Sequence, residues 1–525
     1  MPATVPTSAH RSVALDDATL RDFQAAFDAG TLTAQALVER SLARIAAFDR
    51  HGPCLNAVIA LHPGALETAR ALDAERRQQG PRSPLHGIPV VLKDNLDTFD
   101  LPTTGGSVLL RGSVPPDDAF VVRQLRAAGA VILAKVNLSE FAAGAAMSSI
   151  QGQTRNPHDL TRTSSGSSGG TGVAVAAGYA PIGVGTDTGG SIRGPAAANG
   201  IAALKPTRGL LSRDGIIPLS PSLDTAGPMA RHVYDLAAAL GVMSGVDPAD
   251  PGTHTSSGQT GLDYTAGLHA QALRGVRLGV ARDFAGADDE VDQVFAASLA
   301  VLQGAGAQLV NVHYPQWLLD VKDGLFNAIR MPEFAAHIAH YLATLGPAYP
   351  RSLAQMIERT QRISPLGDGR TGTNPVRWAQ FEAEAASGPI DSASYTSLIT
   401  HGLPLVQGVV EGLFQTHRVQ AIVYPTAIRR AAQAQAYNAH PAGPATGSAA
   451  NLANLAGLPD LVVPAGWTHD GLPVCLSFLG TAFSEPQLLA LGYAFEQATH
   501  ARRQPVHAPA LAGESIRVPR ESARA

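Results

Sequence analysis

Charged residues and cysteines are both scarce in this chain. Only 16% of the 525 residues are charged, against roughly 25% in average proteins, while 45% are hydrophobic. A composition this rich in apolar side chains excludes a disordered chain and indicates a large globular protein with an extensive interior. The two cysteines, Cys54 and Cys475, lie far apart in the sequence, which excludes a disulfide framework and a CxxC metal site.

Long hydrophobic runs and a charge excess of one sign are also missing. No apolar stretch reaches the ~18 residues of a membrane span, and residues 1–20 contain no signal-peptide core. The net charge of −4 comes from 39 basic and 43 acidic residues that are interspersed along the chain. No basic stripe therefore offers a surface to nucleic acid or to an anionic membrane. We expect a soluble cytoplasmic protein with neither of these partners.

Apolar segments that alternate with helical patterns predict an α/β fold. Amphipathic helices are expected within residues 16–50, 63–79 and 117–128. The predicted architecture is a single large mixed β-sheet covered by helices on both faces. From residue 240 to 415 the strand signals thin out and longer helices carry aromatic side chains. Apolar runs typical of strands lie at 57–61, 88–92, 130–136, 182–185, 276–280, 308–312, 421–424, 461–463 and 474–478.

Glycine and serine are concentrated between residues 163 and 209. This segment contains Thr-Ser-Ser-Gly-Ser-Ser-Gly-Gly-Thr-Gly from Thr163 and Gly-Thr-Asp-Thr-Gly-Gly-Ser-Ile-Arg from Gly185. A Ser/Gly-rich segment is usually a flexible linker. Here, apolar runs at 173–177 and 181–184 place the glycines inside folded structure. The segment is therefore predicted to form functional turns.

The turn from Thr188 to Ser191 has the composition of an oxyanion hole. Glycines let backbone N–H groups converge on a small anion, so the amides of Thr188, Gly189, Gly190 and Ser191 are candidate donors. A phosphate-binding loop is the rival interpretation, but GxxxxGK[ST] is absent. Residues 166–170 match the G-x-S-x-G nucleophile elbow only formally, because polar residues rather than an apolar strand precede them.

Lys93 is the candidate base for a serine nucleophile. It ends the apolar run at 88–92, so burial would lower its pKa and leave a lone pair free to accept a proton. The histidines are scattered, and none has a recognisable triad context. A lysine after a strand is nevertheless more often solvated, and these residues alone leave both interpretations open.

Several ordered motifs together resemble the amidase signature family. They are Lys93-Asp94-Asn95, Gly-Ser-Ser-Gly-Gly at 166–170, Asp-Thr-Gly-Gly-Ser-Ile-Arg at 187–193, Leu-Lys-Pro-Thr at 204–207 and Asp-Thr-Ala-Gly-Pro-Met at 224–229. The likeness covers about residues 20–245 and 421–505. It implies a Ser-Ser-Lys triad in which Ser191 is the nucleophile, Ser167 the bridging serine and Lys93 the base. It also implies that no metal or other cofactor is needed.

The resemblance suggests roles for further residues around the triad. Asp187 and Arg193 are expected to brace the turn by hydrogen bonds, although Arg193 could instead bind a substrate carboxylate. Met147 and Ser148 precede the serine loop at a position where the family's backbone often faces substrate. Ser168 is expected to be a loop residue and not the bridge.

One histidine-containing cluster has a spacing that could hold a metal ion. Glu333, His337 and His340 lie at i, i+4 and i+7 and would share one face of a helix. The H-E-x-x-H pattern is absent, and the resembled family needs no metal. No metal site is therefore predicted.

The family's fold implies that residues 1–525 form a single amidase domain. Its expected parts are an N-terminal helical region (1–80), the signature catalytic core (81–245), a variable and mostly helical substrate-shaping region (246–415), a C-terminal return to the sheet (416–505) and a tail (506–525).

The resemblance implies hydrolysis of a carboxylic amide to an acid and ammonia or an amine, through an acyl-enzyme on Ser191. Segments at 52–59, 85–89, 153–157, 212–218 and 472–474 resemble those of bacterial peptide amidases, so a small-molecule or short-peptide amide is the expected substrate. Two enzyme alternatives stay open, the A subunit of a tRNA-dependent amidotransferase and an aryl acylamidase or urethanase. A ligand-binding protein with a phosphate-holding loop is the non-enzymatic alternative. A homodimer is one of the oligomeric states left open.

Overall fold

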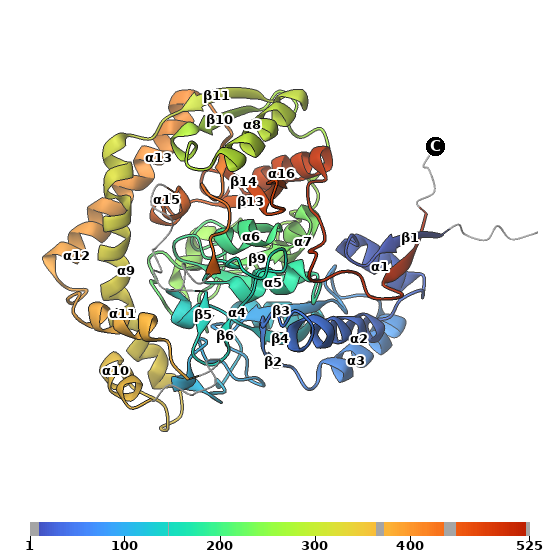
Figure 1. Ribbon diagram of the computed structural model, residues 1–525, viewed down its shortest axis with the longest axis horizontal. Coiled ribbons are helices and arrows are strands. Elements are labelled where there is room, and N and C mark those ends of the chain that lie inside the picture. The colour runs from blue at the N-terminus through green and yellow to red at the C-terminus, as the bar shows by residue number, and fades with distance from the viewer. Residues whose placement is uncertain (1–9, 145, 364–371, 435–447, 521–525) are drawn as a thin grey trace, which may run out of the picture.

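A mixed β-sheet runs through the centre of the computed structural model, which describes residues 10–144, 146–363, 372–434 and 448–520 (Figure 1). Within these residues eleven strands pair in the order β11-β10-β12-β14-β13-β8-β9-β7-β3-β4-β2, which confirms the predicted mixed sheet. The strands are β2 (Val58–Leu61), β3 (Pro89–Lys93), β4 (Val131–Val136), β7 (Ile182–Asp187), β8 (Ala202–Lys205), β9 (Thr225–Ala230), β10 (Arg277–Ala281), β11 (Gln308–Val312), β12 (Ala421–Pro425), β13 (Asp460–Trp467) and β14 (Pro473–Leu479).

Helices cover both faces of this sheet, as the alternation of side chains along its strands requires. These helices are α1 (Leu20–Asp28), α2 (Ala34–Arg44), α3 (Ala65–Gln79), α4 (Phe120–Ala127), α5 (Gly169–Ala176), α6 (Arg193–Asn199), α7 (Val233–Met243), α8 (Asp289–Gly304) and α16 (Glu485–Thr499). Ala203 of β8 and Val462 of β13 pack in one cluster with residues of α5 and α6. The next residues along, Leu204 and Val463, pack in another cluster with residues of α7 and α16.

The neighbouring strands β3 and β7 position the candidate site. They are parallel, with Leu92 opposite Val184. Both strands are buried along their whole length, which explains why apolar residues and glycine make up most of their sequences. Because parallel strands end at the same edge of a sheet, Lys93 at the end of β3 lies beside Thr186 and Asp187 at the end of β7.

Two central strands, β8 and β9, were not predicted. β9 contains Gly227-Pro228, a pair that normally indicates a turn, yet it pairs antiparallel with both β7 and β8. A Cβ atom at Gly227 would lie 2.2 Å from the backbone oxygen of Leu204. The glycine is therefore needed for close approach between strands, and this requirement is not visible in a local sequence pattern.

Further helices beyond the sheet line one side of the molecule, in yellow and orange in Figure 1. They are α9 (Gln316–Thr344), α10 (Leu353–Gln361), α11 (Pro375–Ala385), α12 (Ala393–Ser397) and α13 (Leu403–His417), and α15 (Ala450–Leu455) lies nearby. The strands β1 (His10–Ala14) and β15 (Ser515–Pro519) pair antiparallel, so the expected tail includes a strand, and residues 521–525 lie outside the described residues. None of the helices described here is long and apolar enough to cross a membrane.

Candidate active site

Lys93 is completely buried at the end of β3. Its Nζ lies 2.7 Å from Ser167 Oγ, 2.7 Å from Thr186 Oγ1 and 3.2 Å from the backbone oxygen of Thr186. Burial lowers the pKa of Lys93 to about 7, although the nearby carboxylates of Asp187 and Asp224 act in the opposite direction. A substantial fraction of Lys93 is therefore neutral near neutral pH and carries a lone pair.

The three oxygens around Lys93 Nζ suit both protonation states of the amine. A protonated amine can donate one hydrogen to each of them. A neutral amine can donate to the two Thr186 oxygens and accept from the hydroxyl of Ser167. Asn95 Nδ2 donates to Thr186 Oγ1 as well, at 3.1 Å, which fixes that side chain. Sequence reasoning missed Thr186, even though it lies inside the Gly-Thr-Asp motif that was singled out.

Ser167 lies in the loop that leads into α5, after a cis Gly166–Ser167 peptide bond. Its backbone oxygen accepts a hydrogen bond from the amide of Ser139 at 3.0 Å. The adjacent Ser168 joins this loop to the turn at 188–191, because its amide donates to Ser191 O at 3.1 Å and its hydroxyl donates to Thr186 O at 3.1 Å. Ser168 is thus occupied in holding the two loops together.

Ser191 lies just before α6 and lines a cavity of about 590 Å³. Ser167, Thr188, Gly189 and Gly190 line the same cavity. The structure therefore brings the two serines and the glycine turn to one space, with Lys93 buried behind Ser167. A cavity of this size falls in the range of small-molecule and cofactor sites.

The four candidate oxyanion donors are not equivalent. The Gly190 amide donates to Asp187 Oδ1 at 2.8 Å, so it is engaged by the protein itself. The prediction that Gly190 is an oxyanion donor is therefore corrected, because its amide hydrogen bond is already accepted by the carboxylate of Asp187. Across the described part of the chain, the amides of Thr188, Gly189 and Ser191 meet no acceptor.

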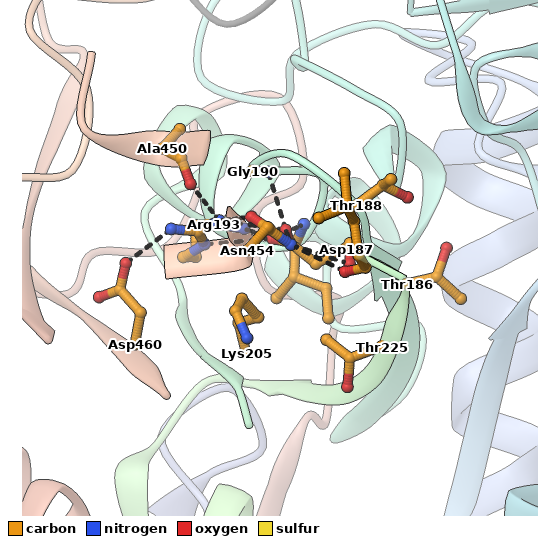
Figure 2. Close-up of polar contacts among 12 residues, drawn as sticks. Thr186, Asp187, Thr188, Gly190, Arg193, Lys205, Thr225, Ala450, Asn454 and Asp460 are labelled. Atoms are coloured by element: carbon orange, nitrogen blue, oxygen red, sulfur yellow. Dashed lines mark hydrogen bonds and ion pairs between the residues drawn. The ribbon is translucent and has the colours of Figure 1, made fainter. Parts of the chain in front are cut away.

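Arg193 and Asp187 form the centre of a buried polar cluster, shown in Figure 2. Arg193 donates to both Asp187 oxygens, to Asp460 Oδ2 at 2.7 Å, to Asn454 Oδ1 at 2.6 Å and to the backbone oxygen of Ala450 at 2.5 Å. Burial alone would raise the pKa of Asp187, but the guanidinium of Arg193 holds it well below its usual range. Every guanidinium nitrogen of Arg193 already has an acceptor within the protein, which favours bracing of the turn over binding of a substrate carboxylate.

Met147 and Ser148 are not brought to the cavity. They form the short strand β5 (Met147–Ser148), which pairs with β6 (Gly152–Gln153). Ser148 is buried, and its Oγ accepts from the amide of Gln151 inside that hairpin. Residues 142–144 line the cavity on this side in their place.

Glu333, His337 and His340 do lie together on α9, but the carboxylate of Glu333 is already engaged. It accepts from Ser220 Oγ at 2.6 Å and from Tyr395 Oη at 2.6 Å. Glu333 thereby ties α9 to the loop before β9 and to α12. In the ranges that the structure describes, no three His, Cys, Asp or Glu side chains are grouped so that they could hold a metal ion.

Comparisons with known proteins agree with this geometry. The native peptide amidase from Stenotrophomonas maltophilia aligns with a TM-score of 0.84 and 39% identity, covering 93% of this chain and 98% of that one. An amidase family protein from Bacillus anthracis aligns with a TM-score of 0.82 and 31% identity, covering 93% and 92%. The A subunit of the glutamyl-tRNA(Gln) amidotransferase from Chloroflexus aurantiacus is 38% identical over 484 residues, which are 91% of this chain and 95% of that protein.

The family model for amidases matches residues 36–489. This match spans the central sheet from β2 to β14 and all the motifs that suggested the resemblance. The chain therefore belongs to the amidase family and is an amidase-type hydrolase that acts on C–N bonds.

Proposed function

We propose that this protein hydrolyses the C-terminal carboxamide of short peptides and releases ammonia. In this proposal Ser191 is the nucleophile, Ser167 relays the proton and Lys93 is the base. The observation that carries the assignment is the 2.7 Å contact between Lys93 Nζ and Ser167 Oγ, made by a buried lysine whose pKa is lowered to about 7. Such a base is matched to the proton it must accept near neutral pH.

The proposed reaction begins with two linked proton transfers. Neutral Lys93 takes the hydroxyl proton of Ser167, which takes that of Ser191 as the Ser191 oxygen bonds to the amide carbon. The amides of Thr188, Gly189 and Ser191 are the candidate donors to the oxyanion. The proton returns from Lys93 through Ser167 to the nitrogen, the C–N bond breaks, and ammonia leaves. Water then hydrolyses the ester on Ser191 with the same groups acting as base and acid.

The peptide-amide class is supported by the relatives and by the cavity. The chain shares 39% identity with a peptide amidase over nearly the full length of both proteins. The cavity beside Ser191 is large enough for a substrate bigger than a simple aliphatic amide. The test is to incubate the purified chain with N-acetyl dipeptide amides and to detect the free acid and ammonia. Turnover that disappears in Ser191→Ala supports the proposal, and hydrolysis of aryl amides or carbamates alone contradicts it.

An amidotransferase component is the second candidate, because of the 38% identity to the amidotransferase protein from Chloroflexus aurantiacus. The two candidates differ in what the isolated chain can do. A peptide amidase hydrolyses peptide amides without any partner chain. An amidotransferase component would instead use glutamine as its amide and require partner chains. Efficient hydrolysis of peptide amides by the isolated chain, with little release of ammonia from glutamine, favours the first candidate.

A further inference from the structure

The charged side chains in the described lining of the cavity are all of one sign. Its described lining contains Arg330, Arg429 and Arg430 and no acidic residue. The charge of Arg430 is neutralised by ion pairs with Asp288 and Glu290, which also fix the orientation of its guanidinium. Arg429 is exposed to solvent, where its charge is screened. Arg330 differs from both, because it is only 7% exposed.

The positive charge of Arg330 is only partly compensated. Its Nη1 donates to Glu384 Oε1 at 2.5 Å, but Arg377 Nη1 also donates to both oxygens of Glu384 at 3.0 Å. Two guanidinium groups thus share the carboxylate of Glu384, and the buried carboxylate of Glu140 also acts on Arg377. Nε and Nη2 of Arg330 have no acceptor among the described residues, and Arg330 faces the cavity.

Arg330 lies on α9 near the turn at 188–191, which contains Ser191. Phe326 lies one helical turn before Arg330 and packs against Gly189. A Cβ atom at Gly189 would lie 2.6 Å from Phe326 Cζ. Arg330 follows about 6 Å further along the helix axis. A carboxylate four carbon–carbon bonds from the scissile carbonyl carbon, as in a glutamate side chain, extends over a comparable length.

We propose that Arg330 is a specificity-determining residue that binds a carboxylate on the acyl part of the substrate. This inference rests on the proposed function and narrows it to amides of acidic residues, such as peptides that end in glutamate amide. The free N–H groups of Arg330 form the ion pair with the substrate carboxylate. Gln380 supports this site, because its Oε1 accepts from Arg377 at 3.4 Å, while its amide hydrogens meet no acceptor among the described residues and can reach a ligand.

The test compares three substrates of similar size, N-acetyl-alanyl amides that end in glutamate, norleucine or lysine. Wild-type kcat/KM should be highest for the glutamate amide and lowest for the lysine amide. Arg330→Gln should lower kcat/KM for the glutamate amide by about 10- to 100-fold, the usual effect of losing a hydrogen bond to a charged group. The norleucine amide should change little, which also shows that the variant is folded. Arg362→Gln makes the same charge change at an exposed site and should alter none of the three values.

A second measurement separates this inference from the reaction itself. Ser191→Ala binds without turnover, so calorimetry on Ser191→Ala with and without Arg330→Gln measures recognition directly. Tighter binding of the glutamate amide that disappears with Arg330→Gln supports the inference, even if no peptide amide is hydrolysed. Equal affinity for the glutamate and norleucine amides overturns it, even if both are hydrolysed.

Discussion

Lys93 Nζ and Ser167 Oγ lie 2.7 Å apart, and both oxygens of Thr186 occupy the other hydrogen-bonding directions of the amine. When Lys93 loses a proton, its two remaining hydrogens can stay on Thr186. The lone pair then points at the hydroxyl of Ser167. The arrangement therefore fixes which group gives up a proton to Lys93.

The rate of amide hydrolysis should depend on the protonation of Lys93. Its pKa is lowered to about 7 by burial, and only the neutral amine can accept a proton. We expect kcat/KM to rise as the pH increases through about 7 and to reach a plateau on the alkaline side. The profile should be measured with a substrate that has no ionisable group. A rate that is flat from about pH 5.5 to about pH 9 would argue against Lys93 as the base.

Thr186→Val removes one acceptor of Lys93 and should affect both rate and pH dependence. Loss of that acceptor disfavours the protonated amine more than the neutral one, so the acidic limb should move to lower pH. The rate at the plateau should fall by about 10-fold, since the direction of the lone pair is less well defined. Thr186→Ser keeps the hydroxyl and should restore both properties. An unchanged acidic limb in Thr186→Val would show that Thr186 only fills space.

Ser167→Ala should impair amide hydrolysis more than ester hydrolysis. An amine leaves only after its nitrogen is protonated, whereas an alkoxide leaves more readily without this help. Without this proton relay, the rate of amide hydrolysis should fall by about 10²- to 10⁴-fold. The rate for an ester with the same acyl group should fall clearly less. Equal losses on both substrates would limit Ser167 to positioning or activating Ser191.

The effect of Lys93→Met on the free energy of unfolding should depend on pH. The variant should gain stability relative to the wild type as the pH falls from alkaline to neutral. Between about pH 10.5 and about pH 7 the unfolded chain binds a proton on Lys93 that the folded chain does not, so the wild type loses stability as the pH falls. The variant has no such loss. The difference in free energy of unfolding between the two proteins should therefore change by up to about 4 kcal/mol across this pH window. Melting temperatures at several pH values test this. A pH-independent difference would mean that Lys93 titrates alike in both states.

Motifs and apolar runs predicted most of the sheet and some of the residues that line the cavity, among them Ser167 and Ser191. The run at 88–92 placed Lys93 at a buried strand end, and the resemblance selected Ser167 and Ser191. The contacts of Thr186 could not be predicted, because they depend on how β3 and β7 are paired in space.

Other features depend on contacts between distant segments. The turn composition gave no sign that the Gly190 amide is engaged by Asp187. The bracing role of Arg193 is supported by its contacts with Asp460 and Asn454, which lie far along the chain and could not be read from the motif. Arg330 showed no motif, and only the packing of α9 against the turn at 188–191 revealed it.

Covalent acylation of Ser191 is the step on which the proposed mechanism depends. A fluorophosphonate probe reacts with an activated serine, and mass spectrometry of the digested protein locates the adduct. We expect one adduct per chain, on Ser191, which forms faster as Lys93 loses its proton and is absent in Ser191→Ala. If the purified enzyme is active but the adduct forms on Ser167 or Ser168, or does not form at all, Ser191 is not the nucleophile.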